Sequence, residues 1–284
     1  MPRRAAVYLF GALAGVVLLV LTWFAALHIG FVERADASVL RGFGTLQGHP
    51  HVGGLAERVA SLCDPRPYVL LCAIPVAMAV ARRRVWTLVA IAVILLGANL
   101  TTAMLKPLLA HPRLDAHALA LSPSINAGSW PSGHATAAMA LALCCMLAAP
   151  GRARPYVAAI GGAFAVAVSY SFLTLKWHYP SDAVAGFLVA ATWTSLAVGA
   201  VLLVERRAGA VTDEPRQRLS VRDALGPPGA LLLAGLILIA LVIVARPHQV
   251  ITYAQQHRVF VAGAAVIGAI GFGLATSMML ALRR

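Results

Sequence analysis

Long apolar runs recur along the whole chain, and they restrict its fold more than any other feature of the sequence. Most of them are long enough to cross a hydrocarbon layer of about 30 Å as a helix. Hydrophobic residues make up 60% of the 284 residues and charged residues only 12%, which excludes an ordinary soluble domain. We therefore expect an all-α polytopic membrane protein with eight spans, near residues 5–31, 67–81, 85–105, 132–149, 156–175, 182–204, 229–245 and 259–282.

The basic residues favour one orientation of these spans. With the N-terminus inside, the cytoplasmic loops and ends hold 14 basic residues and the outer segments hold 9, in keeping with the positive-inside rule. Both termini are then cytoplasmic. The net charge of +13 follows from this loop pattern, so no nucleic-acid partner is expected. The outward-facing segments are 32–66, 106–131, 176–181 and 246–258.

The polar segments divide the chain into parts. Segment 32–66 mixes apolar and charged residues, and an amphipathic helix on the outer surface and an ordinary loop explain it equally well. We expect a transmembrane core over 1–204, a cytoplasmic linker rich in Arg and Pro over 205–228, and a hairpin of two spans over 229–284. Packing on the core, a homodimer contact and a role in lipid entry are three open interpretations of this hairpin.

Three polar clusters fall at the outer ends of the central spans. They are Lys106–Arg113, Pro131–His134 (Pro-Ser-Gly-His) and His178–Asp182. The second cluster opens a helix, where free backbone N–H groups and the positive end of the helix dipole suit a phosphate group. Its histidine can give or take a proton near neutral pH. Because all three clusters face the same side of the membrane, they predict one phosphate-handling site.

Together the clusters resemble the motifs of the type 2 phosphatidic acid phosphatases (PAP2), a family that shares its phosphate site with vanadium haloperoxidases and bacterial acid phosphatases. The family pattern is Lys, six residues, Arg-Pro; then Pro-Ser-Gly-His; then Ser-Arg, five residues, His, three residues, Asp. The resemblance covers about residues 106–186. It implies a core of six transmembrane helices and an enzyme that removes phosphate from lipids.

The resemblance also implies a role for each matching residue. His178 attacks phosphorus and forms a phosphohistidine, which water then hydrolyses. Asp182 holds the imidazole of His178, and His134 protonates the leaving oxygen and then activates water. No metal ion or other cofactor is implied. The groups expected to bind the phosphoryl oxygens are Lys106, Arg113 and the backbone N–H groups around Ser132 and Gly133.

Two departures from the family pattern affect this interpretation. Leu114 follows Arg113 where the family has a proline, and Phe172 follows Ser171 where the family has an arginine that grips phosphate oxygens. Lys176 is a candidate replacement for that arginine, because it lies one turn from position 172 if the fifth span is still helical there. The alternative for Lys176 is a long side chain that reaches the membrane interface.

We therefore expect a metal-independent phosphatase acting on the extracytoplasmic face of a plasma (inner) membrane. The expected substrate is a membrane lipid phosphate: phosphatidic acid, phosphatidylglycerol phosphate, a polyprenyl (di)phosphate or a prenyl-linked sugar phosphate. A high ratio of Arg to Lys and Ala-rich spans indicate a bacterial source. Two alternatives stay open: a lipid phosphotransferase using the same covalent step, and a non-catalytic lipid-phosphate binder or transporter, for which Phe172 is the main support.

Overall fold

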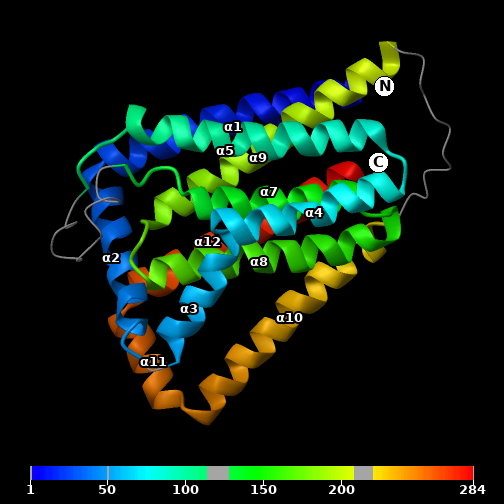
Figure 1. The fold of residues 1–284 in the computed structure, drawn as a ribbon. Coiled ribbons are helices and arrows are strands. Elements are labelled where there is room, and N and C mark those ends of the chain that lie inside the picture. Colours follow the sequence, from blue (N-terminus) through cyan, green and yellow to red (C-terminus); the bar gives the residue numbers. More distant parts are fainter. Residues whose placement is uncertain (1, 50, 114–127, 208–219, 284) are drawn as a thin grey trace.

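The structure is a computed structural model that describes residues 2–49, 51–113, 128–207 and 220–283, and in these ranges its regular secondary structure is entirely helical (Figure 1). The expectation of an all-α fold is confirmed. The helices are α1 (Pro2–His28), α2 (Gly30–Leu46), α3 (Val52–Ala60), α4 (Pro65–Ala81), α5 (Val85–Leu108), α7 (Gly133–Ala148), α8 (Arg154–Thr174), α9 (Pro180–Arg207), α10 (Val221–Ala245), α11 (Pro247–Gln256) and α12 (Arg258–Leu282), with short 3-10 turns at Ser61–Cys63 and Gly151–Ala153.

The described helices include six that are long and apolar enough to cross a membrane: α1, α5, α8, α9, α10 and α12. These correspond to six of the eight predicted spans and make the protein a multi-pass membrane protein. The other two predictions need correction. Helix α4 has 17 residues and reaches spanning length only together with α3, across a bend of 59°. Helix α7 has 16 residues and is too short to count as a span.

Helix α7 lies inside the bundle, which explains why it can be short. It packs against α4, α5, α8, α9 and α12, and nearly all of its residues are buried. Its length is about 24 Å, less than the hydrocarbon thickness, but its neighbours rather than lipid cover its sides. Many of its residues are alanines, whose small side chains let neighbouring helices approach closely. The apolar run predicted the helix but not its central position.

Helix α2 crosses one end of the bundle, so it caps the ends of the longer helices rather than running beside them (Figure 1). Its buried face contacts α8, α12, α1 and α9. The prediction of an amphipathic helix in segment 32–66 is therefore confirmed for α2, and the loop alternative is wrong there. The buried residues of this face are Asp36, Ala37, Val39, Leu40, Gly42 and Phe43.

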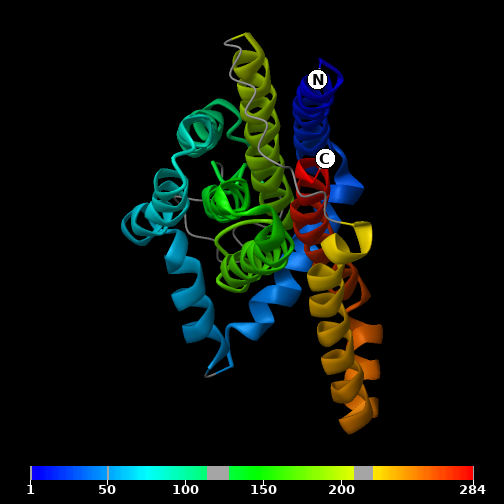
Figure 2. The ribbon, with the colours of Figure 1, turned by 90° about the vertical axis from the view of Figure 1, so that its right-hand side faces the viewer.

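Arginines close the helix ends at the opposite side of the bundle. Arg82 Nη1 donates to the carbonyl oxygen of Ala148 (2.9 Å), and Arg154 Nη1 donates to that of Leu282 (3.0 Å). A cation at a helix C-terminus satisfies free carbonyls and interacts favourably with the helix dipole. Both chain termini lie at this same end (Figures 1 and 2), which is the arrangement that the charge pattern predicted.

The C-terminal helices differ from the prediction in where they begin. Helix α10 starts at Val221 and contains Pro227 and Pro228, so the predicted linker 205–228 is shorter than expected; residues 208–219 lie outside the described residues. In α10 only Ala224 and Pro228 are buried. Figure 2 shows α10, α11 and the start of α12 extending away from the rest of the bundle. Lipid or another protein surface would have to cover this apolar helix.

A close approach of α7 and α9 near the site depends on Gly186. A Cβ atom at this position would lie 2.7 Å from both the Ser132 carbonyl oxygen and the Ala135 Cβ, and 2.8 Å from the Thr136 backbone nitrogen. Such distances are shorter than van der Waals contact, and backbone atoms cannot move aside cheaply. The absence of a side chain at Gly186 therefore sets the spacing between the two helices.

We expect Gly186→Ala to lower the stability of the protein by about 1–3 kcal/mol through this overpacking. The measurement is the thermal unfolding midpoint of the purified protein in detergent. Gly235→Ala is the matched control, because a Cβ there meets nothing within 4 Å. Equal midpoints for the two variants would contradict the proposed packing constraint.

Candidate active site

The three polar clusters of the sequence meet at the end of the bundle that α2 crosses. Lys106 lies in the last turn of α5, and Arg113 lies in the connection that follows. Pro131–His134 form the entry to α7, His178 lies in the connection from α8 to α9, and Asp182 lies in the first turn of α9. The bundle brings together ends of helices that are far apart in the sequence, and the chemistry of the site comes from those ends.

His178 and Asp182 form a buried pair. The Nδ1 atom of His178 lies 3.3 Å from Oδ2 of Asp182, and the same oxygen accepts the backbone N–H of Tyr179 at 3.0 Å. Asp182 thus reaches back to the start of its own helix, as the acidic residue of a capping box does, with Pro180 in the favoured first position. With Nδ1 as the donor to Asp182, the Nε2 atom carries the free lone pair of the ring.

His134 faces the same space as His178, and their ring centroids are 6.2 Å apart. Its Nε2 atom lies 3.2 Å from Oδ1 of Asp64, the residue that precedes α4. Burial and the neighbouring His178 lower the pKa of His134, and the Asp64 carboxylate opposes this by holding the ring and favouring its protonated form. The sequence analysis did not identify Asp64, because it is 70 residues away from His134 and belongs to none of the three clusters.

Two cations lie beside the histidines. The Nζ atom of Lys106 would be 3.9 Å from a Cβ atom at Gly133, which places the ammonium group at the start of α7. Arg113 is buried, with Cζ 4.2 Å from the centre of the Tyr179 ring and Nη2 3.7 Å from Oδ1 of Asp182. Its Nε and Nη1 atoms are buried without a hydrogen-bond partner among the described residues. Both predicted cations therefore lie at the site.

The entry to α7 differs from the prediction at Ser132. The backbone N–H of Ser132 donates to the carbonyl oxygen of Asp182 (3.0 Å), and its Oγ accepts the N–H of Ala135 (3.3 Å). The Ser132 N–H is thus already used between α7 and α9, and the expectation that it binds phosphate is wrong for this structure. The first-turn N–H groups of Gly133 and His134 have no partner within the helix and remain the backbone donors for an anion.

Phe172 occupies the place beside the two histidines. Its ring centroid is 5.1 Å from that of His178 and 6.3 Å from that of His134, and its side chain is completely buried. Trp177 adds a second aromatic ring, 5.5 Å from His134. Where the family pattern has a cation, this site has the side chain of Phe172, with the ring of Trp177 close by.

The geometry assumed for Lys176 as a replacement cation is wrong. Helix α8 ends at Thr174, and Lys176 has a positive φ of 58°, so it does not continue the helix from Phe172. Its N–H donates to the Leu173 carbonyl, and the Trp177 N–H donates to that of Phe172, which is the hydrogen-bond pattern of a Schellman helix end. The stem of Lys176 lies against Gly44 of α2, with Cδ 3.0 Å from a Cβ atom placed there.

Asp36 of α2 is a second carboxylate that the sequence analysis missed. It is buried, and it accepts hydrogen bonds from Arg113 and from Ser181 of α9. The available signal was an acidic residue on the apolar face of an amphipathic helix, next to Ala37, Val39 and Leu40. A charge is rarely buried without a partner, so this position indicated a cation nearby.

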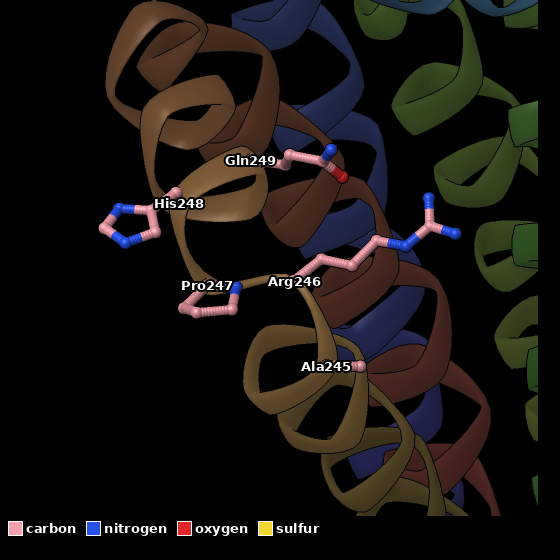
Figure 3. A pocket seen from close by; sticks show the side chains of 5 residues that line it. All are labelled: Ala245, Arg246, Pro247, His248 and Gln249. Carbon is pink, nitrogen blue, oxygen red and sulfur yellow. The ribbon is translucent and has the colours of Figure 1, made fainter.

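Two surface hollows of the described structure are lined by other residues than these. One is at the junction of α10 and α11, lined by Ala245, Arg246, Pro247, His248 and Gln249. Figure 3 shows the side chains of Arg246 and His248 pointing in opposite directions. Because these polar groups diverge, the hollow does not form a second constellation of the kind seen around His178.

The comparisons with known proteins agree with this geometry. Residues 86–206 match the model of the PAP2 superfamily. No curated protein sequence matches the chain. Among solved structures, the chain is similar to one described as the first transmembrane PAP2 type phosphatidylglycerolphosphate phosphatase from Bacillus subtilis, with a TM-score of 0.54 and 20% identity, covering 72% of this chain and 99% of that chain.

At this identity the likeness to the solved structure shows a shared fold. The family match adds more, because residues 86–206 contain all three clusters, from Lys106 to Asp182. Asp36 and Asp64 lie outside the matched range. The prediction of a PAP2-type phosphatase is confirmed, and residues 86–206 of this chain match the PAP2 superfamily.

Proposed function

We propose that this protein hydrolyses the phosphate group of a membrane lipid through a covalent intermediate on His178. The observation that carries the proposal is the buried His178–Asp182 pair beside Lys106 and Arg113. A histidine whose Nδ1 is held by a carboxylate presents Nε2 as a nucleophile, and nearby cations neutralise the oxygens of a phosphoryl group. A protein that only binds lipid phosphate needs no such nucleophile.

In the proposed reaction, Nε2 of His178 attacks phosphorus and the bond from phosphorus to the lipid oxygen breaks. The leaving oxygen takes a proton from His134, and the phosphoryl group stays on His178. Water then attacks phosphorus while His134 accepts the proton of that water, so inorganic phosphate leaves and both histidines return to their starting states. Asp182 keeps the Nδ1 proton in place and stabilises the positive charge that develops on the ring.

Arg113 supports an anionic substrate through its unpaired nitrogens. Its Nε and Nη1 atoms are buried without a partner among the described residues, and a buried unpaired donor costs about 1–3 kcal/mol. A phosphoryl oxygen would satisfy such donors. Lys106 and the first-turn N–H groups of α7 would complete the set of phosphate contacts.

The position of the site at helix ends supports a lipid substrate. Exposed apolar side chains follow one face of α5 up to the turn that holds Lys106: Leu100, Met104 and Leu108 are 60%, 63% and 73% exposed. They are spaced four residues apart and therefore lie on one face of the helix. Lys106 is two positions from Met104 and Leu108 and therefore lies on the other side of α5, toward Gly133, so the lipid-facing side and the phosphate-binding side belong to the same helix end. We place this end of the bundle on the extracytoplasmic side of a bacterial inner membrane, following the charge pattern of the loops.

A lipid phosphotransferase is the second candidate. The aromatic rings of Phe172 and Trp177 beside His134 make the surroundings of the phosphoryl group more apolar than a cation would. Such surroundings favour the hydroxyl group of a second lipid over water as the acceptor. Products that depend on an added acceptor lipid would distinguish transfer from hydrolysis.

The test is phosphate release by the purified protein in detergent with EDTA present. The substrates are phosphatidic acid, phosphatidylglycerol phosphate, a polyprenyl diphosphate and a prenyl-linked sugar phosphate. We expect release from at least one of them, and its loss in His178→Ala, because the covalent step needs this ring. No release from any lipid by a folded protein, with or without acceptor lipids, would contradict the proposal.

The two lysines of the chain provide a matched pair for the same assay. Lys106→Ala is expected to lower kcat/KM by about 100-fold or more, since it removes a charge at the phosphate. Lys176→Ala is expected to cost less than about 10-fold, because its stem lies against α2 at a helix end. A larger loss from Lys176→Ala than from Lys106→Ala would show that Lys176 replaces the missing arginine after all.

Asp64 is expected to assist His134 in protonating the leaving group. We expect Asp64→Asn to lower kcat on a lipid phosphate by about 10-fold or more, the lower part of the range for general acid–base catalysis. The loss should be smaller on an aryl phosphate, whose leaving oxygen needs less protonation. Glu57→Gln, an exposed acid on α3, is the control. Equal losses on the two substrates would contradict this role for Asp64.

A further inference from the structure

Asp36 is the buried acidic group in the part of α2 that crosses the site. It is 5% exposed and lies on a face that is otherwise apolar. Burial of a carboxylate among apolar side chains is costly unless the charge is paired and hydrogen-bonded. The groups that bond to the Asp36 carboxylate therefore indicate its role.

Both carboxylate oxygens of Asp36 are used. Oδ1 accepts the backbone N–H of Ser181 at 2.9 Å, and Oδ2 accepts the Ser181 hydroxyl at 2.6 Å together with Nη2 of Arg113. Ser181 is the second residue of α9 and precedes Asp182. A carboxylate at this position satisfies a free N–H group and interacts favourably with the positive end of the helix dipole. Helix α2 thus supplies a capping group to α9.

Arg113 lies between two carboxylates. Its Nη2 atom is hydrogen-bonded to Asp36 and lies 3.7 Å from Oδ1 of Asp182, whose Oδ2 holds His178. Without the charge of Asp36, Asp182 would be the remaining carboxylate beside this guanidinium. Arg113 would then be drawn toward Asp182, because the attraction between buried opposite charges is strong. The contact between Asp182 and His178 would have to compete with it.

We propose that Asp36 is a positioning residue of the phosphatase site: it holds Arg113 for the phosphate and the first turn of α9 for the His178–Asp182 pair. The inference rests on the proposed function of this site. It goes beyond the family motifs, because Asp36 lies outside the range that matches the family. Asp36 acts through Arg113 and Asp182 and does not itself touch the reacting atoms.

The protonation of Asp36 gives the proposal a pH signature. Burial and the neighbouring charge of Asp182 raise the pKa of Asp36 to about 6, although Arg113 and the hydrogen bonds from Ser181 lower it. Among the other charged groups packed near α2, Lys176 in the turn after α8 lies against Gly44, and Arg258 of α12 lines a hollow together with Arg41. Asp36 is ionised above its pKa, so the activity that depends on it should rise as the pH increases through about 6.

The experiment measures kcat/KM for phosphatidic acid in detergent micelles between pH 5 and pH 8, values that bracket the Asp36 pKa of about 6. Asp36→Asn is expected to lower kcat/KM by about 10- to 100-fold above that pKa, the loss typical of removing an outer partner of a site. It should also lose the part of the pH profile that rises near pH 6. Glu57→Gln removes an exposed carboxylate from α3 and is expected to change neither property.

Two further measurements separate positioning from a general loss of stability. In a double-mutant cycle, Asp36→Asn should cost less in the Arg113→Gln background than in the wild type, because part of the effect of Asp36 passes through Arg113. Orthovanadate resembles the phosphoryl group during its transfer. It should raise the thermal unfolding midpoint of the wild type much more than that of Asp36→Asn. If Asp36→Asn does not fold, Ser181→Ala takes its place, since it removes one hydrogen bond to Asp36 and should cause a smaller loss in the same direction.

The outcomes distinguish this inference from the proposed function. An Asp36→Asn or Ser181→Ala variant that behaves like Glu57→Gln, or fully additive losses with Arg113→Gln, would overturn the role of Asp36 while the phosphatase activity stands. A wild type that releases no phosphate but is stabilised by orthovanadate would overturn hydrolysis. The difference in vanadate stabilisation between wild type and Asp36→Asn would then still decide the role of Asp36.

Discussion

The carboxylate of Asp182 and its peptide group tie the candidate site together. One oxygen of the side chain accepts from His178 and from the N–H of Tyr179, and the main-chain carbonyl accepts the N–H of Ser132. The start of α9 is thereby joined to His178, the proposed nucleophile, and to the start of α7. Because these groups are buried at helix ends, each must find a partner within the protein. The same hydrogen bonds that complete the helix ends also orient the catalytic groups.

Much of the fold and of the site could be predicted from the sequence, because the signals are local. Apolar length predicted the helices, and the clusters around Lys106, His134 and His178 predicted which helix ends meet. Local signals could not show that other helices surround α7, since the burial of a helix depends on which helices pack against it. They also could not show that α8 ends before Lys176, where a positive φ replaces the expected helical turn. The contacts of Asp36 and Asp64 join residues 77 and 70 positions apart, which no spacing rule reveals.

The site combines side chains from the segment that matches the PAP2 superfamily with carboxylates from the N-terminal part of the chain. Residues 86–206 provide the histidines, Asp182 and the two cations, whereas α2 and the residue before α4 provide carboxylates that contact Arg113 and His134. Phe172 fills the place of a family cation with an apolar ring. In the proposed reaction the hydrogen bonds between Asp36 and Arg113 therefore matter more, because Arg113 and Lys106 are the two cations expected to contact the phosphate.

Direct detection of phosphate on His178 tests the central claim most closely. Purified protein would be mixed with a lipid phosphate carrying radioactive phosphorus, quenched in base within milliseconds, and examined for labelled protein and the labelled residue. The account predicts a base-stable, acid-labile label on His178 that forms before inorganic phosphate is released and is absent from His178→Ala. Steady release of phosphate without any labelled protein, and retained in His178→Ala, would contradict it.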